Sequence, residues 1–296
     1  ARHLLMALNA GEPYRVVRAL ALEIGHSATE GSRSQVFTNQ LCHQALVLAK
    51  KINHPHTSAL SILETGFAAY MQGNWVKSYQ MFTKAEPILQ EQCTNVTWEM
   101  DTAHYFLVRT LLFLGKITEL TQQLSTFLKD AQERGDLFAA TNLRIWSHMV
   151  FLAADEPEEA SKEIEAAMAS WVRKSFDLQH YWRLYTEVEI DLYQSNFEMA
   201  WQRIQKIWPA LSSSFFLRTQ IIAIESFHFR ARTALALATQ AQNSQQDPNK
   251  YLTIAQKDAK RIYKEKATWG NALASLILAS IADIRGQKEQ AINYLL

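Results

Sequence analysis

The sequence predicts an all-α protein, and three features of the 296-residue chain lead to this prediction. Glycine and proline, which interrupt helices, number only nine and six. Runs of β-branched residues are scarce beside the abundant helix formers Ala, Leu, Gln and Lys. Short turn signals separate amphipathic segments along the whole chain, as they do where helices are joined by tight turns. Hydrophobic residues make up 48 % of the chain, which is enough to bury a core.

One turn pattern recurs at a nearly constant interval. It occurs in the segments YMQGNW, LFLGKI, LAADEPEEA, LYQSNFEMA and DIRGQKEQA, each of which joins two amphipathic stretches. A small or apolar residue follows five positions after each turn residue, and these residues are Ser78, Leu120, Ala160, Ala200 and Ala291. The first three intervals between them are 42, 40 and 40 residues, and the last is 91, which fits two units with an insertion. Such a period predicts an α-solenoid, in which each helical hairpin stacks on the next.

Seven hairpins are expected in order along one domain that spans residues 1–296. Their ranges are 13–52, 57–92, 98–134, 136–174, 178–210, 215–266 and 268–296. The sixth is irregular, because its first helix is expected to run to about Ala238 before a polar loop insertion at 239–249.

The second hairpin resembles the tetratricopeptide repeat. Gly66 is the small residue of its first helix and Gly73 its turn residue, followed by Ser78, Phe82 and Ala85 in the second helix. Small residues let helices approach closely, and a large one such as Phe82 fills the space between hairpins. In later units the place of Gly66 is taken by Val108, His148 and Val188. This resemblance implies a right-handed superhelix of about seven hairpins, each longer than the usual repeat.

The charge and cysteine content of the chain argue against several kinds of binding partner and against a disulfide or zinc framework. Thirty Lys and Arg balance 29 Asp and Glu, so no overall field favours nucleic acid or an acidic membrane. No apolar run approaches the ~20 residues that span a bilayer. Cys42 and Cys93 are too few and too far apart to indicate a disulfide framework or a zinc site. We therefore expect a cytoplasmic protein that binds neither nucleic acid nor membrane.

The motifs of known catalytic sites are missing from the sequence. It contains no GxxxxGK[ST], GxGxxG, GxSxG or HExxH pattern, so we expect neither an enzyme nor a bound cofactor or metal. His54 and His56 precede a helix and are interpreted as part of a turn. The basic segment 250–266 could contact phosphates or acidic partners, but a solvated helix face is the simpler interpretation.

An aromatic and polar segment, LQHYWRLYTEVEIDLYQ, leaves two interpretations open. It forms the core between repeats, or it faces the concave groove that tetratricopeptide proteins use to bind ligands. For the second interpretation the candidate partner-binding residues are Phe67, Tyr105, Arg109, Trp182, Tyr185 and Glu189. Replacement of Trp182 and Tyr185 by Ala should then weaken partner capture with a modest loss of stability.

Several segments together resemble the C-terminal tetratricopeptide-like region of large bacterial serine/threonine protein kinases. They are AGEPYRVVRALALE, FAAYMQGNW, LQHYWRLYTEVEIDLYQ, IWPALSSS and RARTALALA, and the similarity covers about 1–240 and again 268 onward. In that family a kinase domain and an AAA/STAND ATPase module precede the helical region. The resemblance implies a fragment of a longer chain that acts as a non-catalytic regulatory scaffold. Its partner would be a protein, a peptide or the upstream domains of its own chain.

The alternative function is the sensing of a small ligand. Helical domains of MalT-like STAND regulators share this class of repeat, and a polar pocket inside the superhelix would favour such a role. A flat open groove would favour protein binding.

Overall fold

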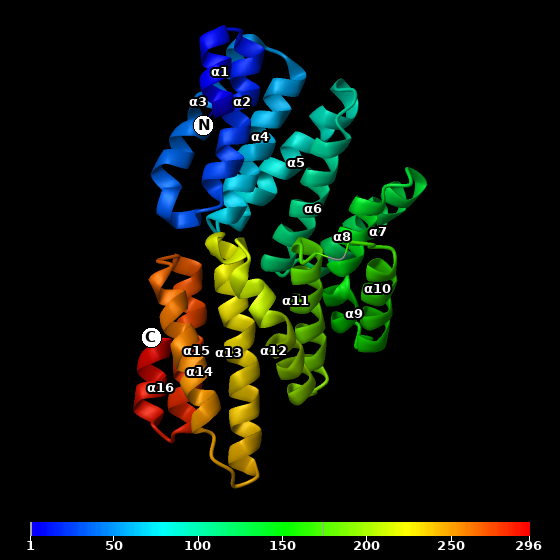
Figure 1. The fold of residues 1–296 in the computed structure, drawn as a ribbon. Helices are drawn as coiled ribbons and strands as arrows, with labels where there is room; N and C mark the ends of the chain where they lie inside the picture. The colour runs from blue at the N-terminus through cyan, green and yellow to red at the C-terminus, as the bar shows by residue number, and fades with distance from the viewer. Residues whose placement is uncertain (1, 174) are drawn as a thin grey trace. The chain divides into compact units, whose positions relative to one another are not determined.

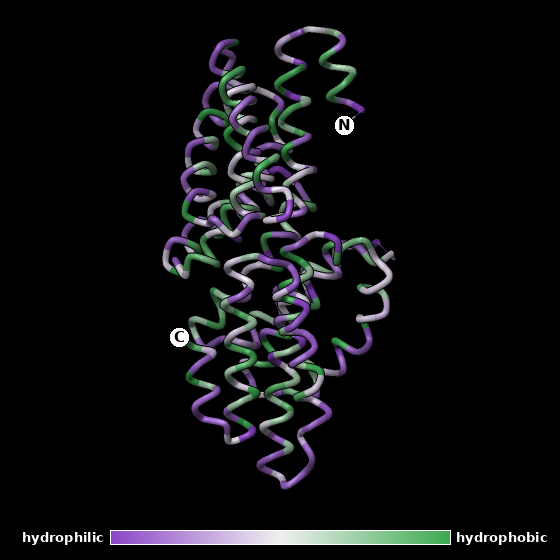
Figure 2. The backbone as a smooth tube through the Cα atoms, turned by 90° about the vertical axis from the view of Figure 1, so that its left-hand side faces the viewer, coloured by the Kyte–Doolittle hydropathy of each residue, from purple (hydrophilic) through white to green (hydrophobic). Residues whose placement is uncertain are grey.

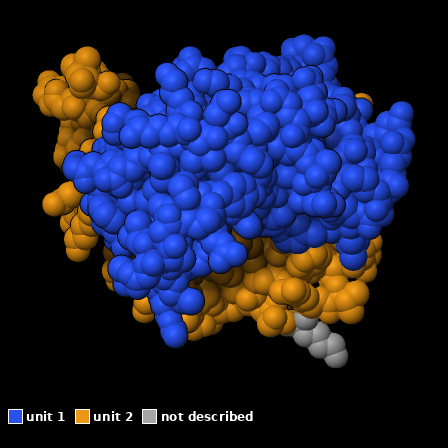
Figure 3. Space-filling model, turned by 90° about the horizontal axis from the view of Figure 1, so that it is seen from above, with its two compact units in different colours: residues 1–146 blue, residues 147–296 orange. Residues whose placement is uncertain are grey.

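The computed structural model describes residues 2–173 and 175–296, and these residues form helices without any strand (Figure 1). The prediction of an all-α protein is confirmed. The chain divides into two compact units, residues 1–146 and 147–296, which Figure 3 colours separately. Each unit is described below by itself, and the single array expected across 1–296 stays a prediction.

The first unit contains the helices up to residue 146. These are α1 (Arg2–Ala10), α2 (Pro13–Ala28), the 3-10 helix η1 (Gly31–Ser34), α3 (Gln35–Ile52), α4 (Pro55–Met71), α5 (Trp75–Gln92), α6 (Thr97–Phe113), α7 (Ile117–Glu133) and α8 (Leu137–Ile145). The second unit contains α9 (His148–Ala153), α10 (Pro157–Ala169), α11 (Leu178–Tyr193), α12 (Phe197–Ser213), the 3-10 helix η2 (Phe216–Arg218), α13 (Gln220–Asn243), α14 (Asn249–Lys264), α15 (Thr268–Ile284) and α16 (Lys288–Leu295).

The five expected turns share one backbone geometry. Their turn residues all have positive φ angles between 60° and 77°, and they are Gly73, Gly115, Asp155, Ser195 and Gly286. In each case the amide after the turn residue donates to a carbonyl five positions earlier, as from Asn74 to Ala69 at 2.8 Å. This bond satisfies an otherwise unpaired carbonyl at the end of a helix. The expectation of tight helix-to-helix turns at these places is confirmed.

The small or apolar residues that the repeat pattern singled out are buried. Ser78, Leu120, Ala160 and Ala200 are fully buried, and Ala291 is 9 % exposed. A Cβ atom added to Gly66 would lie 3.0 Å from Cβ of Met81 and 3.1 Å from the ring of Phe82. Gly66 therefore lets α4 and α5 approach more closely than any side chain would allow.

Within each unit, helices pack on their neighbours in the chain and on the next helix but one. In the first unit α2 contacts α4, α4 contacts α6, and α6 contacts α8; in the second unit α11 contacts α13, and α13 contacts α15. We call these the first helices, and we call α3, α5, α7, α10, α12, α14 and α16 the second helices. Helices of successive hairpins therefore contact one another within each unit.

The structure differs from the expected element boundaries in three places. Helix α1 was not expected, and α13 continues to Asn243, so residues 239–243 are helical and only 244–248 connect α13 to α14. Ala241 is 8 % exposed and the side-chain amide of Gln242 donates to the Ile284 carbonyl at 3.0 Å, which explains the extension. The remaining connection is hydrophilic (Figure 2). The fourth hairpin was expected to have one continuous first helix, but residues 146–147 separate α8 from α9. Its expected end, Lys174, lies outside the described residues.

Candidate functional site

Phe67 and Tyr105 lie partly exposed on the first helices α4 and α6 of the first unit. Both rings pack against Phe106, with centroid distances of 4.8 Å and nearly perpendicular planes. Edge-to-face packing of this kind fixes ring positions and leaves part of each ring accessible. The structure therefore brings these two candidate residues together around Phe106.

Arg109 lies inside the same unit. It is 3 % exposed, and its guanidinium carbon lies 3.8 Å from the ring centroid of Trp146 and 5.5 Å from that of Tyr70. A guanidinium held between aromatic faces stabilises the fold by cation–π attraction. Because so little of its surface is accessible, we assign Arg109 to the packing of the unit and not to partner contact.

The three candidates of the second unit lie on α11 and differ in exposure. Trp182 is 8 % exposed, whereas Tyr185 is half-buried between the rings of His148 and Phe229, at centroid distances of 6.3 and 6.0 Å. Glu189 accepts a hydrogen bond of 2.6 Å from the Arg232 guanidinium on α13. Tyr185 and Glu189 can still be reached from solvent, but Trp182 belongs to the core.

Arg232 also affects the neighbouring His228, and the sequence analysis singled out neither residue. Burial lowers the pKa of His228 to about 3, and the positive charge of Arg232 adds to the decrease. The imidazole is therefore neutral near pH 7. Near pH 7 the charged groups on the accessible face of α11 and α13 are therefore Glu189 and Arg232, and not His228.

A cavity of about 510 Å³ lies among α12, α13 and α14 of the second unit, and we call it the α12–α14 cavity. Its walls come from one stripe of α12 and one of α14, at the spacing of three and four residues that defines a helix face. The lining residues are Trp201, Ile204, Gln205, Trp208, Pro209, Arg230, Ile254, Lys257, Asp258 and Arg261.

A buried ion pair forms one side of this cavity. Both the Nε and an Nη atom of Arg230 donate to the carboxylate of Asp258, and the guanidinium carbon lies 3.5 Å from the ring centroid of Trp208. Arg261 Nη1 lies 3.7 Å from the same carboxylate. Burial raises the pKa of Asp258, and Arg230 opposes the rise. Arg230 is thus fixed from two sides.

The cavity changes the interpretation of the basic helix α14. Its residues Lys250, Lys260 and Lys264 are exposed, as expected of a solvated face, and so is Lys266 just after the helix. The exposed Lys257 and the half-buried Arg261, however, line the cavity. The sequence carried a signal for this, since the buried Asp258 falls in the apolar stripe formed by Ala255, Ala259 and Ile262.

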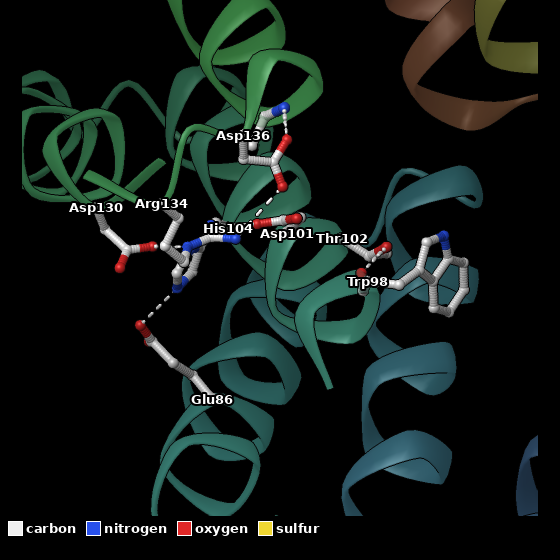
Figure 4. A network of polar contacts seen from close by, with 9 residues as sticks. Glu86, Trp98, Asp101, Thr102, His104, Asp130, Arg134 and Asp136 are labelled. Atoms are coloured by element: carbon white, nitrogen blue, oxygen red, sulfur yellow. Dashed lines mark hydrogen bonds and ion pairs between the residues drawn. The ribbon is translucent and has the colours of Figure 1, made fainter. Parts of the chain in front are cut away.

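The first unit has a cavity of similar volume, about 510 Å³, among α5, α6 and α7, which we call the α5–α7 cavity. Figure 4 shows its polar side, where His104 Nε2 lies 3.2 Å from a Glu86 carboxylate oxygen. The His104 ring also stacks on Phe127 at 3.7 Å.

Arg134 of the α5–α7 cavity is surrounded by carboxylates. It donates to Asp101 at 2.7 Å, Asp130 at 2.9 Å and Asp136 at 3.3 Å (Figure 4). The positive charge of Arg134 is therefore offset within the unit. Cys93 also lines the cavity, and burial raises the pKa of its thiol.

His54 and His56 occupy the start of α4, as the sequence analysis expected. His54 is the N-cap residue, and its ring accepts from the backbone amide of His56 at 3.2 Å. His56 bridges the Tyr14 hydroxyl at 2.9 Å and a Glu99 carboxylate oxygen at 3.0 Å. Among the described residues, no three His, Cys, Asp or Glu side chains are grouped so that they could hold a metal ion.

Glu64 is a buried acid inside the first unit. It lies on α4, is 5 % exposed, and its Oε2 atom lies 2.9 Å from the place where a Cβ atom of Gly25 would stand. Burial raises its pKa to about 8, and the negative charge of Glu99 adds to the rise. Glu64 therefore keeps its proton near pH 7.

Comparisons with known proteins leave the family open. No protein-family model matches the chain, and no curated protein matches its sequence. Within the described part of the chain, no helix combines the length and apolar character needed to cross a membrane.

Proposed function

We propose that the chain is a non-catalytic interaction module built from tetratricopeptide-like hairpins in a right-handed superhelix. Three observations support the repeat: the shared geometry of the five turns, the close approach at Gly66, and the packing of successive first helices on one another within each unit. The binding surface in this proposal lies on the first helices, where side chains accessible to a partner gather.

One observation carries the binding proposal. Partly exposed aromatic and charged side chains stand among buried neighbours on the first helices of each unit. They are Phe67 and Tyr105 in the first unit, and Tyr185, Glu189 and Arg232 in the second. Aromatic and arginine side chains dominate the energetics of protein interfaces. A peptide segment with both apolar and charged groups fits the surface that Tyr185, Glu189 and Arg232 form on α11 and α13 of the second unit.

The resemblance to bacterial serine/threonine kinases supports a regulatory role for this module. In that role the module recruits a protein or contacts the kinase and ATPase domains of its own chain. The proposal assigns no catalytic step to residues 1–296, because the motifs that bind ATP and magnesium are missing from the sequence.

The test selects binding peptides from a displayed random library with immobilised residues 1–296 as bait. We expect Tyr185→Ala combined with Glu189→Gln to weaken the selected peptides at least tenfold, which corresponds to about 1.4 kcal/mol. Trp182→Ala is unsuitable, because truncation of a buried Trp costs about 3–5 kcal/mol of stability. The control is Lys260→Gln on the exposed face of α14. Failure to enrich any peptide, or equal binding by both variants, would contradict the proposal.

The second candidate function is the sensing of a small ligand. It is favoured by one observation, the α12–α14 cavity, whose volume of about 510 Å³ falls in the range of small-molecule sites. The cavity is lined by residues of α12, α13 and α14 other than the candidate partner-binding residues.

A further inference from the structure

We propose that the α12–α14 cavity binds a small organic anion that carries a flat apolar group, such as an aromatic carboxylate. This inference rests on the second candidate function and gives it a place and a class of ligand. It is independent of peptide binding on the first helices.

The walls of the cavity suit the apolar part of such a ligand. Trp201, Ile204, Trp208 and Pro209 line it from α12, and Ile254 lines it from α14. A volume of about 510 Å³ accommodates one or two fused rings together with an acidic group. Indole and aliphatic side chains favour flat apolar groups through burial and ring stacking.

The charges of the cavity select an anion. Three cationic side chains, Arg230, Lys257 and Arg261, meet a single carboxylate, Asp258, among the described residues that line it. Asp258 is engaged by both donors of Arg230, whereas the Arg261 guanidinium remains 3.7 Å away, beyond hydrogen-bond distance. Lys257 forms no ion pair with any residue in the described part of the chain.

Lys257 and Arg261 are placed to bind one anion together. They lie four residues apart on α14, so they project from the same face of the helix. A guanidinium can donate two parallel hydrogen bonds to a carboxylate or phosphate, and an ammonium beside it adds charge. Because Trp208 and Asp258 already fix Arg230, the site needs little reorganisation when a ligand enters.

The α5–α7 cavity provides an internal comparison. Each cavity lies among two successive second helices and the first helix between them, and both have volumes of about 510 Å³. The α5–α7 cavity is lined by one cationic side chain, Arg134, and by two carboxylates, Glu86 and Asp130. Arg134 is also paired with Asp101 and Asp136, which lie outside the cavity lining. The excess of positive charge is therefore specific to the α12–α14 cavity and does not follow from the packing of hairpins alone.

The test uses 19F NMR of protein labelled with 5-fluorotryptophan, in which the eight tryptophans give separate probes. The Trp201 and Trp208 resonances are assigned with Trp201→Phe and Trp208→Phe variants. The probes added are 1-naphthylacetate, 1-naphthyl phosphate, the neutral 1-naphthylacetamide, and acetate alone. The first two distinguish a carboxylate ligand from a phosphate ligand, and the last two separate the contributions of charge and of the rings.

We expect 1-naphthylacetate or 1-naphthyl phosphate to shift the Trp201 and Trp208 resonances in a saturable manner. Binding should weaken at least tenfold in Lys257→Gln/Arg261→Gln and for the neutral amide. The matched control, Lys260→Gln/Lys264→Gln, removes the same charge from the exposed face of α14 and should bind as the unaltered protein does. Circular dichroism verifies that both variants stay helical, and Lys257→Gln alone serves if the double variant unfolds.

Three results would overturn the inference: no saturable shift with either anion, equal binding of the neutral amide, or unchanged affinity in Lys257→Gln/Arg261→Gln. Peptide binding by the same variant separates the two functions. If the variant binds selected peptides normally but not the anions, the cavity acts independently of the first helices. If the unaltered protein binds peptides but neither anion, only the cavity proposal falls.

Discussion

The Glu64→Gln variant should make the protein more stable at neutral pH. Glu64 is 5 % exposed in the first unit, and burial together with Glu99 raises its pKa from 4.5 to about 8. Folding therefore takes up a proton between pH 4.5 and about 8, because the unfolded side chain is ionised over this range and the folded one is not. Each rise of one pH unit in this window should lower the free energy of unfolding by about 1.4 kcal/mol.

The size of the destabilisation at pH 7 follows from the difference between pH 7 and 4.5, the pKa of Glu64 in the unfolded chain. The favourable contribution of protonated Glu64 is fully present below pH 4.5, decreases through the window, and is lost above about pH 8. At pH 7 the accumulated cost is about 3 kcal/mol. Gln has nearly the shape of the protonated acid but takes up no proton, so the variant should avoid this cost.

The assay is urea unfolding followed by far-UV circular dichroism at pH 5, 6, 7 and 8. Hydrogen exchange of peptides from α2 to α4 reports the same effect locally, since stacked hairpins can open in parts. We expect Glu64→Gln to be more stable at pH 7 and to converge with the unaltered protein toward pH 4.5. Glu91→Gln on the exposed face of α5 is the matched control. Parallel pH profiles of Glu64→Gln and the unaltered protein would refute the reasoning.

Two further predictions concern a turn and the α12–α14 cavity. Ser195→Gly should raise the free energy of unfolding by about 1 kcal/mol, because Ser195 has a φ angle of 61° that glycine adopts without strain; a lower urea midpoint would contradict this. Asp258→Asn should lower the free energy of unfolding by about 3 kcal/mol, because it leaves the Arg230 guanidinium, with 13 % of its side chain exposed, without its anionic partner. Exposed Asp247→Asn is the control for the second variant, and equal urea midpoints for the two variants would refute it.

The turns could be predicted from the sequence because their causes are local. A residue with a left-handed conformation lies in each of the five turns, and only glycine or a small polar residue adopts that conformation readily. Five positions later a small or apolar residue must enter the helix contact, as the fully buried Ser78 and Ala200 do. Both requirements restrict the residue type at positions close to the turn, so the turn can be recognised from the sequence.

The extent of α13 could not be read from composition. The segment after Ala238 is polar and resembles a loop, yet Gln and Ala are good helix formers. What decides its conformation is contact with α15, since the Gln242 side chain donates to the Ile284 carbonyl 42 positions away. Polar composition alone therefore located the connection near 244–248 but overestimated its length.

Because burial depends on contacts between distant residues, the sequence did not distinguish the buried candidate residues from the accessible ones. Helical periodicity places Trp182 and Tyr185 near one another on α11, but only packing decides that the first is 8 % exposed and the second half-buried. Arg109 shows this more strongly, because the Trp146 ring that covers its guanidinium comes from 37 positions further along the chain.

For the α12–α14 cavity, by contrast, the sequence indicates that a buried ion pair is present but not which residues form it. An acid in the apolar stripe of a basic helix requires a buried cation as partner, and Asp258 is such an acid. The sequence alone does not identify this partner as Arg230, because the pair is made between two helices 28 positions apart. Once Arg230 is assigned to Asp258, the helix period leaves Lys257 and Arg261 at the cavity and Lys260 and Lys264 in solvent. A neutral count of charges over the whole chain therefore hides a local excess of positive charge, and this local excess is what the anion titration measures.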